Sequence, residues 1–318
     1  MHFNALIWKN LDTSFIKPRY WPVWLAVGLL RFAIIFPHSQ RMYIGKLLGR
    51  AVYRFSQKRR KIASINIATC FPGLSKEEQQ AIVKKHFDSL GMSVIESAMS
   101  WWMDNDRLKS LASIEGIENL EQAVAQQRGV ILLSAHFNSL EISSPLMIAN
   151  TGYAVQAVYQ ANSNPLLEKI ITEGRRNNVE ALISHKNIKQ MIRALKQKKI
   201  VWYAPDQGYA GKFSEIVPFF NTPAASNTAV SRLAKISGAV VVPFFIRQKP
   251  DNSGYVLTYL PVLEDFPTED AVADTQRYHH IVEQEIMKAP EQYLWIHRRF
   301  KNRPEEYPDL YKDIVLRK

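Results

Sequence analysis

Two histidine–glutamate pairs in the chain have the residue types of a general base and its carboxylate partner: His136/Glu141 in "SAHFNSLE" and His280/Glu285 in "HIVEQE". A neutral imidazole, with an unperturbed pKa of about 6.5, can take a proton from a hydroxyl group near pH 7. A carboxylate on its other ring nitrogen fixes the tautomer and stabilises the imidazolium that forms. If the substrate supplies the attacking hydroxyl, such a pair needs no nucleophilic serine or cysteine.

The spacing of these pairs is not informative, because chance predicts nearly one such pair among eight histidines and 29 acidic residues. His280 falls within an expected helix, where five residues turn two side chains apart, so we interpret it as a surface or core-edge residue. His136 follows "GVILL", at the expected end of a buried strand, where sites form in open α/β sheets. A bend there would let Glu141 fold back onto the imidazole. The alternative is that His136 only hydrogen-bonds the backbone.

The elements that would position His136 alternate between strands and helices. Apolar runs of strand length predict strands at 129–136, 153–160, 200–206, 239–248 and 255–262, the last two as a hairpin. Amphipathic stretches predict helices at 50–61, 74–99, 114–129, 187–200, 226–238 and 274–290, and a further helix from Ser139. We therefore predict an α/β fold with a mostly parallel central sheet flanked by helices, behind an α-helical N-terminal quarter.

The positive charge is concentrated at the N-terminus. Residues 1–61 contain twelve Lys/Arg and one acidic residue, whereas residues 62–318 are nearly neutral with 29 Lys/Arg and 28 acidic residues. The basic block surrounds "YWPVWLAVGLLRFAIIFP", which favours an anionic membrane surface as the partner and argues against nucleic acid. We predict a membrane-associated segment at 1–61 and a catalytic domain at 62–318.

The apolar run between Pro22 and Pro37 is short for a membrane span, which needs about 20 residues, and it carries Arg31. We favour an interfacial or shallowly inserted helix over a tilted single span. A cleaved signal peptide is disfavoured because no small-residue cleavage site follows the run.

Several common site signatures are missing from the sequence. It has no GxG dinucleotide fingerprint, Walker A loop, GxSxG elbow or HExxH motif. Its one cysteine, Cys70, excludes an internal disulfide and any CxxC site and fits a reducing compartment. We therefore expect neither a metal nor a bound cofactor.

Six sequence blocks between His136 and Pro304 make the chain recognisable, and the resemblance that they carry runs from about Leu25 to Pro304. They are "HFNSLE", "QANSNPLLEKIITEGRRN", "VWYAPDQGY", "VPFF" (twice), "SGAVVVPFFIRQKPDNSGYVL" and "APEQYLWIHRRFKNRP". Together they resemble the lipid A late (secondary) acyltransferases, the lauroyl and myristoyl transferases of Gram-negative bacteria. The glycerolipid acyltransferases, which share a His-x4-acid motif, are similar more distantly.

The resemblance implies particular roles for residues of this chain. It assigns His136 as catalytic base and Glu141 as its acidic partner, where many family members have Asp, and it points to a substrate-binding set of Asn164, Arg175, Arg176, Asp206 and Arg247. Alternatives remain open: Arg175 and Arg176 as a surface pair, Asp206 in an ion pair with an arginine, and Asn164 as a turn former before proline. Basic residues in the last block are expected to meet acidic acyl carrier protein or lipid phosphate, or to form a solvated edge.

The function implied by the resemblance is transfer of a fatty acyl group from acyl carrier protein to a hydroxyl of a lipid A (Kdo-lipid) precursor, at the cytoplasmic face of the inner membrane. Three alternatives are a glycerolipid or lysophospholipid acyltransferase, a thioester hydrolase with water as acceptor, and a non-enzymatic basic membrane or nucleic-acid binder. The last predicts basic residues spread over 62–318, where the net charge is only about +1.

Overall fold

The structure is a computed structural model that describes residues 13–314, so the first twelve residues of the expected 1–61 segment lie outside the described residues. Helices in chain order are α2 (Trp21–Ala33), α3 (His38–Phe55), α4 (Gln57–Cys70), α5 (Lys76–Trp102), α6 (Asn105–Lys109), α7 (Ile117–Ala125), α8 (Leu140–Thr151), α9 (Pro165–Arg175), α10 (Ile188–Lys196), α11 (Ala229–Ser237) and α12 (Ala271–Lys288). Short 3-10 turns lie at η1 (Thr13–Ile16), η2 (Pro18–Tyr20) and η3 (Pro290–Gln292).

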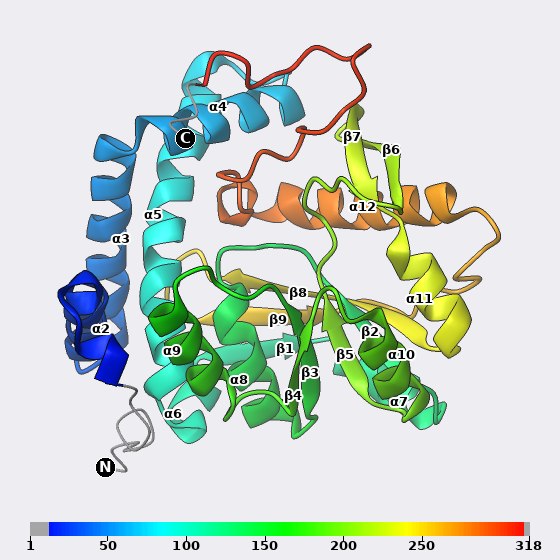
Figure 1. The fold of residues 1–318 in the computed structure, drawn as a ribbon, viewed down its shortest axis with the longest axis horizontal. Helices are drawn as coiled ribbons and strands as arrows, with labels where there is room; N and C mark the ends of the chain where they lie inside the picture. Colours follow the sequence, from blue (N-terminus) through cyan, green and yellow to red (C-terminus); the bar gives the residue numbers. More distant parts are fainter. Residues whose placement is uncertain (1–12, 315–318) are drawn as a thin grey trace.

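A seven-stranded sheet forms the centre of the molecule, in the order β1-β9-β8-β2-β5-β3-β4 (Figure 1). The strands are β1 (Ala112–Glu115), β2 (Val130–Leu133), β3 (Val155–Tyr159), β4 (Ala181–Ser184), β5 (Ile200–Tyr203), β8 (Val240–Gln248) and β9 (Tyr255–Tyr259). All neighbours pair in parallel except β8 and β9, which pair antiparallel. The predicted α/β fold with a mostly parallel sheet is confirmed.

Both faces of the sheet are buried, which explains the continuous apolar strands. Along β2, Ile131 and Leu133 face one hydrophobic core, and Val130 and Leu132 face the other. The first core is completed by residues of α4, α10, α11 and α12, and the second by residues of α5, α6, α7 and α8. Side chains alternate between faces along a strand, so a strand covered on both sides has to be apolar at every position.

The N-terminal quarter is helical, as expected. The long helix α5 begins with the predicted capping box, in which Ser75 and Glu78 exchange hydrogen bonds. It packs closely against α3, where Gly49 and Gly91 face each other: a Cβ atom on Gly49 would lie 1.9 Å from the carbonyl oxygen of Phe87. Glycine thus permits the two backbones to touch, and α5 becomes a fixed wall beside the sheet (Figure 1).

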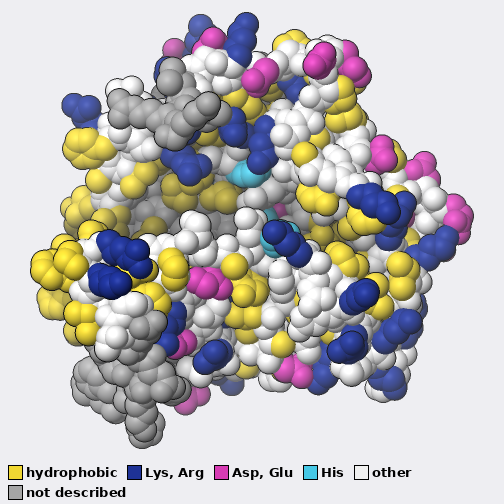
Figure 2. Space-filling view, in the orientation of Figure 1, with side chains coloured by type: hydrophobic (Ala, Val, Ile, Leu, Met, Phe, Trp, Pro, Cys, Tyr) yellow, Lys and Arg dark blue, Asp and Glu magenta, His cyan; other side chains and the backbone are white. Residues whose placement is uncertain are grey.

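The surface of α2, α3 and the short connection between them carries large apolar side chains. Exposed members are Trp21, Leu25, Leu29, Phe32, Ile35, Tyr43, Leu47, Leu48, Val52 and Phe55. Figure 2 shows hydrophobic side chains gathered over α2 at the left, beside Lys or Arg side chains. Among residues 13–314, no helix has the length and apolar character that crossing a bilayer requires.

The structure adds elements that the sequence pattern did not predict. β1 lies where a helix was expected to begin, β4 was not predicted, and a small antiparallel sheet forms from β6 (Ser214–Phe219) and β7 (Thr222–Asn227). Edge strands β1 and β4 have four residues each and are only partly buried, so they lack a clear apolar run. The expected helix at 50–61 is divided at Ser56 between α3 and α4.

Candidate active site

His136 lies in the loop that follows β2, at the carboxyl edge of the central sheet. β2 pairs in parallel with β5, and Leu133 lies opposite Tyr203 at the end of this pairing. Each strand is followed after three residues by a polar side chain, His136 in one case and Asp206 in the other. The ends of parallel neighbours lie at the same edge of a sheet, so this register brings the two side chains together.

A histidine–aspartate pair forms at this edge. Nδ1 of His136 lies 2.6 Å from Oδ1 of Asp206. The other carboxylate oxygen, Oδ2, accepts hydrogen bonds from the backbone N–H of His136 at 3.1 Å and from the Tyr293 hydroxyl at 2.8 Å. The Asp206 side chain is 1% exposed and that of His136 is 29% exposed. With Nδ1 engaged, Nε2 is the ring nitrogen that can meet a substrate.

The two groups shift each other's pKa. Burial by itself raises the pKa of Asp206, but the charge of His136 and hydrogen bonds from His136 and Tyr293 outweigh burial and lower it to about 2. Burial by itself lowers the pKa of His136, and the Asp206 carboxylate outweighs this effect, so the net pKa is raised. A higher imidazole pKa gives a stronger base, provided that the ring is neutral at the working pH.

A C-terminal segment, residues 290–295, holds the histidine loop from one side, and we call this segment the strap. The backbone N–H of Asn138 donates to the carbonyl of Gln292 at 2.7 Å, and that of Leu294 donates to the carbonyl of His136 at 2.9 Å. The tyrosine that contacts the aspartate also belongs to the strap. The "APEQYLW" part of the sequence therefore positions both members of the pair.

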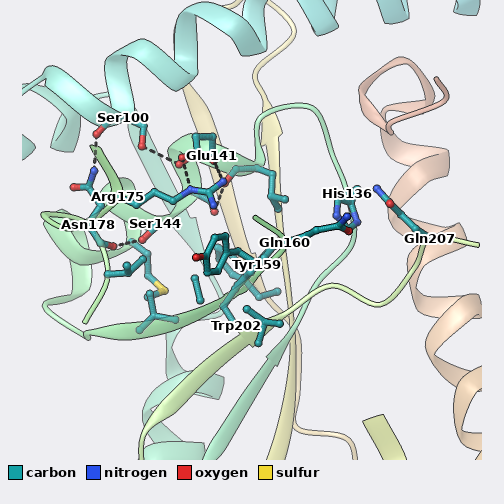
Figure 3. Close-up of a pocket in the computed structure, with 18 residues that line it drawn as sticks. Ser100, His136, Glu141, Ser144, Tyr159, Gln160, Arg175, Asn178, Trp202 and Gln207 are labelled. Carbon is teal, nitrogen blue, oxygen red and sulfur yellow. Dashed lines mark hydrogen bonds and ion pairs between the residues drawn. The ribbon is translucent and has the colours of Figure 1, made fainter. Parts of the chain in front are cut away.

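Glu141 pairs with Arg175 rather than with His136 (Figure 3). Arg175 donates through Nε and Nη2 to the two carboxylate oxygens at 2.8 and 2.5 Å, and the Trp101 indole N–H donates to Glu141 at 2.7 Å. Glu141 lies in the first turn of α8, beside α5 and α9, while Asp206 occupies Nδ1. The expected contact between Glu141 and the imidazole is therefore wrong. Glu141 lines the same pocket as His136, and its part in the site stays a prediction.

The remaining residues of the predicted substrate-binding set lie elsewhere. Arg176 is exposed just after α9, and Arg247 on β8 pairs with Glu115 at 3.2 Å. Asn164 is the N-cap of α9, where its side chain accepts two backbone N–H groups, as expected of a turn former. None of the three lines the pocket.

The pocket has a volume of about 350 Å³ and extends from His136 toward the end of α5 (Figure 3). Its walls include the apolar side chains Met147, Val155, Trp202 and Phe244. Gln207 lies beside His136 at one end, and the Glu141–Arg175 pair lies along the side. A pocket that has a base at one end, an apolar wall and several polar side chains along its sides can hold a reacting group that carries an aliphatic chain.

His280, the histidine of the second pair, lies outside this site. His280 is exposed on α12 and lies 3.4 Å from Glu283, while Glu285 pairs with Lys288. Over residues 13–314, no group of three or more His, Cys, Asp or Glu side chains is arranged to hold a metal ion. The part of Tyr293 was missed, since a lone tyrosine in an irregular segment gives no periodic signal.

Known proteins are similar to this chain over nearly its whole length. The family model described as "Bacterial lipid A biosynthesis acyltransferase" matches residues 8–302. The lipid A biosynthesis lauroyltransferase of Escherichia coli (strain K12) is 38% identical over 304 residues, which cover 95% of this chain and 98% of that protein. The palmitoleoyltransferase of the same strain is 37% identical over 305 residues, with the same coverage. Its myristoyltransferase is 30% identical over 315 residues, 97% of each chain.

A solved structure with partial likeness is that of the 1-acyl-sn-glycerophosphate acyltransferase PlsC from Thermotoga maritima. It has a TM-score of 0.37 and 13% sequence identity and covers 78% of this chain and 96% of that one, a likeness too low to carry an argument. The match to the family model and the identity to the Escherichia coli enzymes are sufficient to assign the family. This chain is an acyltransferase and belongs to the bacterial lipid A biosynthesis acyltransferase family.

Proposed function

We propose that this enzyme transfers a fatty acyl group from acyl carrier protein to a hydroxyl group on an acyl chain of a lipid A precursor, with His136 as the general base. The observation that carries the proposal is the His136–Asp206 pair at one end of a pocket with an apolar wall. Family membership supports the lipid A precursor as acceptor. The proposed donor rests on the resemblance of the sequence blocks, and the proposed base rests on the geometry of the His136–Asp206 pair.

In the proposed reaction, Nε2 of His136 removes the proton from the acceptor hydroxyl as its oxygen attacks the thioester carbonyl carbon. Asp206 holds the imidazole through Nδ1 and stabilises the imidazolium that forms. The tetrahedral intermediate then collapses with cleavage of the carbon–sulfur bond. The thiolate of the carrier leaves and takes the proton back from the imidazolium, so the ester product and free thiol balance the two substrates.

We propose supporting roles for two groups that lie near His136 in the pocket. The Gln207 side chain lies beside His136, and its amide is a candidate donor to the oxyanion of the intermediate (Figure 3). Arg175 has two of its guanidinium nitrogens committed to Glu141. We therefore propose that the Glu141–Arg175 pair shapes the acyl pocket.

The proposed location is the cytoplasmic face of the inner membrane. The support is the exposed apolar face of α2 and α3 together with the excess of twelve Lys/Arg over one acidic residue in positions 1–61. Arg298 and Lys301 are partly exposed after the strap and suit an acidic carrier, whereas Arg299 is buried on Ser226 and the Ala225 carbonyl. The donor-binding surface therefore excludes Arg299.

The test is acyl transfer from radiolabelled acyl-acyl carrier protein to a purified lipid A precursor in detergent micelles. His136→Ala should lower kcat/KM by about 10³-fold or more, because loss of the base removes the proton acceptor. His280→Ala is the matched control and should be nearly silent, since that residue is exposed away from the pocket. Near-normal turnover by folded His136→Ala would overturn the mechanism, and absence of ester product from the wild-type enzyme would overturn the donor or acceptor assignment.

A further inference from the structure

A second and larger cavity lies next to the catalytic pocket. Its volume is about 840 Å³, and its walls come from the C-terminal part of α2, the end of α5, the start of α6 and the residues after α9. Ser100 and Asn178 line both cavities. The proposed mechanism uses the smaller pocket alone and leaves this space without a ligand.

The larger cavity combines two arginines with an apolar lining. Arg31 stacks over the Trp102 ring at 4.8 Å, and burial lowers its pKa, although an arginine stays charged at any working pH. Arg107 lies on α6 and is exposed. Within residues 13–314, neither guanidinium has an ion pair with a carboxylate, and Asp104 at the rim is the cavity's one acidic residue. The cavity therefore carries net positive charge.

The apolar part of the lining comes from the end of α2 and the two residues that follow it, and it continues onto the exposed surface of α2. Phe32, Ile34 and Ile35 line the cavity, and Phe32 and Ile35 are also 60% and 72% exposed. Trp21 and Leu25 extend the same helix surface outward. A molecule with an aliphatic chain could pass from that surface into the cavity without exposing the chain to water.

A thin wall of hydrogen-bonded side chains separates the two cavities. Trp101 lines the larger cavity, and its indole N–H donates to Glu141 in the catalytic pocket. The Asn178 amide donates to the Ser100 carbonyl at 2.5 Å, and the Ser100 hydroxyl donates to the Glu141 carbonyl at 3.0 Å. A ligand in the larger cavity would thus touch the residues that hold Glu141.

We propose that the larger cavity is a binding site for a phosphorylated lipid, with the phosphate on Arg31 and Arg107 and an aliphatic chain against Phe32, Ile34, Trp102 and Met103. Arginine is suited to phosphate because its planar fork gives charge-assisted hydrogen bonds. Identifying this lipid as the acyl acceptor rests on the proposed function. The binding of a phosphorylated lipid in this cavity does not depend on that function.

Binding is tested directly with the full chain and dioleoyl phosphatidic acid in neutral detergent micelles, by the change in tryptophan fluorescence that Trp101 and Trp102 should report. The double variant Arg31→Gln/Arg107→Gln should weaken apparent affinity at least about tenfold, as expected for loss of two charge-assisted contacts. Arg31→Lys/Arg107→Lys, which keeps the charge, should recover part of the loss. Lys109→Gln, an exposed neighbour on α6 that does not line the cavity, should bind like the wild type.

Further arms identify the ligand. Diacylglycerol, which lacks the phosphate, should bind as weakly to the wild type as phosphatidic acid does to the double variant. Inorganic phosphate at millimolar concentration should not displace the lipid, because it cannot use the apolar wall. Equal binding of phosphatidic acid by wild type and a double variant with an unchanged melting temperature would overturn the proposal, and so would displacement by free phosphate.

The kinetic arm separates this site from the proposed function. In the acyl-transfer assay, the double variant should raise KM for the lipid acceptor about tenfold and leave kcat and KM for the acyl donor unchanged. A raised KM for the donor instead would overturn the assignment of the acceptor to this cavity. If the wild-type enzyme formed no ester at all, the proposed function would fail, while loss of phosphatidic acid binding in the double variant would still support the lipid site.

Discussion

Replacing Asp206 by asparagine changes one atom in the pair that we propose to be catalytic, and the structure shows what that change does. Oδ2 accepts from two donors, the backbone N–H of His136 and the hydroxyl of Tyr293. The backbone donor is fixed, so the asparagine oxygen has to take this position. The amide NH₂ then faces Nδ1 at the place of the present 2.6 Å contact.

The consequence is a reversed imidazole tautomer. Nδ1 becomes an acceptor from the amide, the ring proton moves to Nε2, and Nε2 can no longer take a proton from the acceptor hydroxyl. The analogous change in a serine protease triad lowers kcat by about 10⁴, and we expect a loss of about 10³- to 10⁴-fold for Asp206→Asn. The variant also lacks the carboxylate that raises the pKa of His136.

The assay is the pH dependence of kcat/KM for acyl transfer. In the wild type, activity should rise with pH and reach half its plateau above pH 6.5, because the raised pKa of His136 keeps the ring protonated below that point. In Asp206→Asn the plateau should fall and the midpoint should move to lower pH. Tyr293→Phe, which removes one donor and keeps the carboxylate, should lose only about 3- to 30-fold.

Glu141→Gln gives the opposing test. If Asp206→Asn kept activity within tenfold and Glu141→Gln shifted the pH midpoint, the carboxylate partner of the base would be Glu141, and the reasoning from the structure would be refuted.

Three further predictions concern stability. A double-mutant cycle with Glu141→Ala and Arg175→Ala should give a coupling free energy of about 1–3 kcal/mol in urea unfolding, because the pair is bidentate and mostly buried. Burial raises the pKa of Glu96 from 4.5 to about 7, so between these pH values the native state holds a proton that the unfolded state releases. The free energy of unfolding should therefore fall by up to about 3 kcal/mol as the pH rises from 4.5 to 7. Glu96→Gln should remove this loss. Gly49→Ala should destabilise by about 2 kcal/mol through its clash with α5, whereas Gly28→Ala, with open space around it, should not.

Each stability prediction has a result that contradicts it. Additive effects at Glu141 and Arg175 would mean that the ion pair contributes nothing measurable. An identical pH dependence of the unfolding free energy in wild type and Glu96→Gln would show that Glu96 titrates as an exposed group. Equal urea midpoints for the two glycine variants would show that the α3–α5 crossing relaxes without cost.

Sequence patterns predicted the elements that have long apolar or amphipathic signals. The buried strands β2, β5 and β8 read as continuous apolar runs because both faces of the sheet are covered, and α5 was recognisable from its capping box. The short edge strands β1 and β4 were not predicted, because partial burial leaves them without such a run.

The active site, too, was predicted from the sequence only in part. The sequence by itself determined that His136 stands at the end of a buried strand, and the resemblance of whole blocks indicated the family. Which carboxylate meets the imidazole was decided by the tertiary structure. Glu141 is five residues away along the chain, yet the first turn of α8 aligns it with Arg175. Asp206 is distant in sequence, yet parallel pairing of β2 with β5 places it on Nδ1. Sequence spacing records distance along the chain, and strand register, which depends on how the whole sheet packs, sets distance in space.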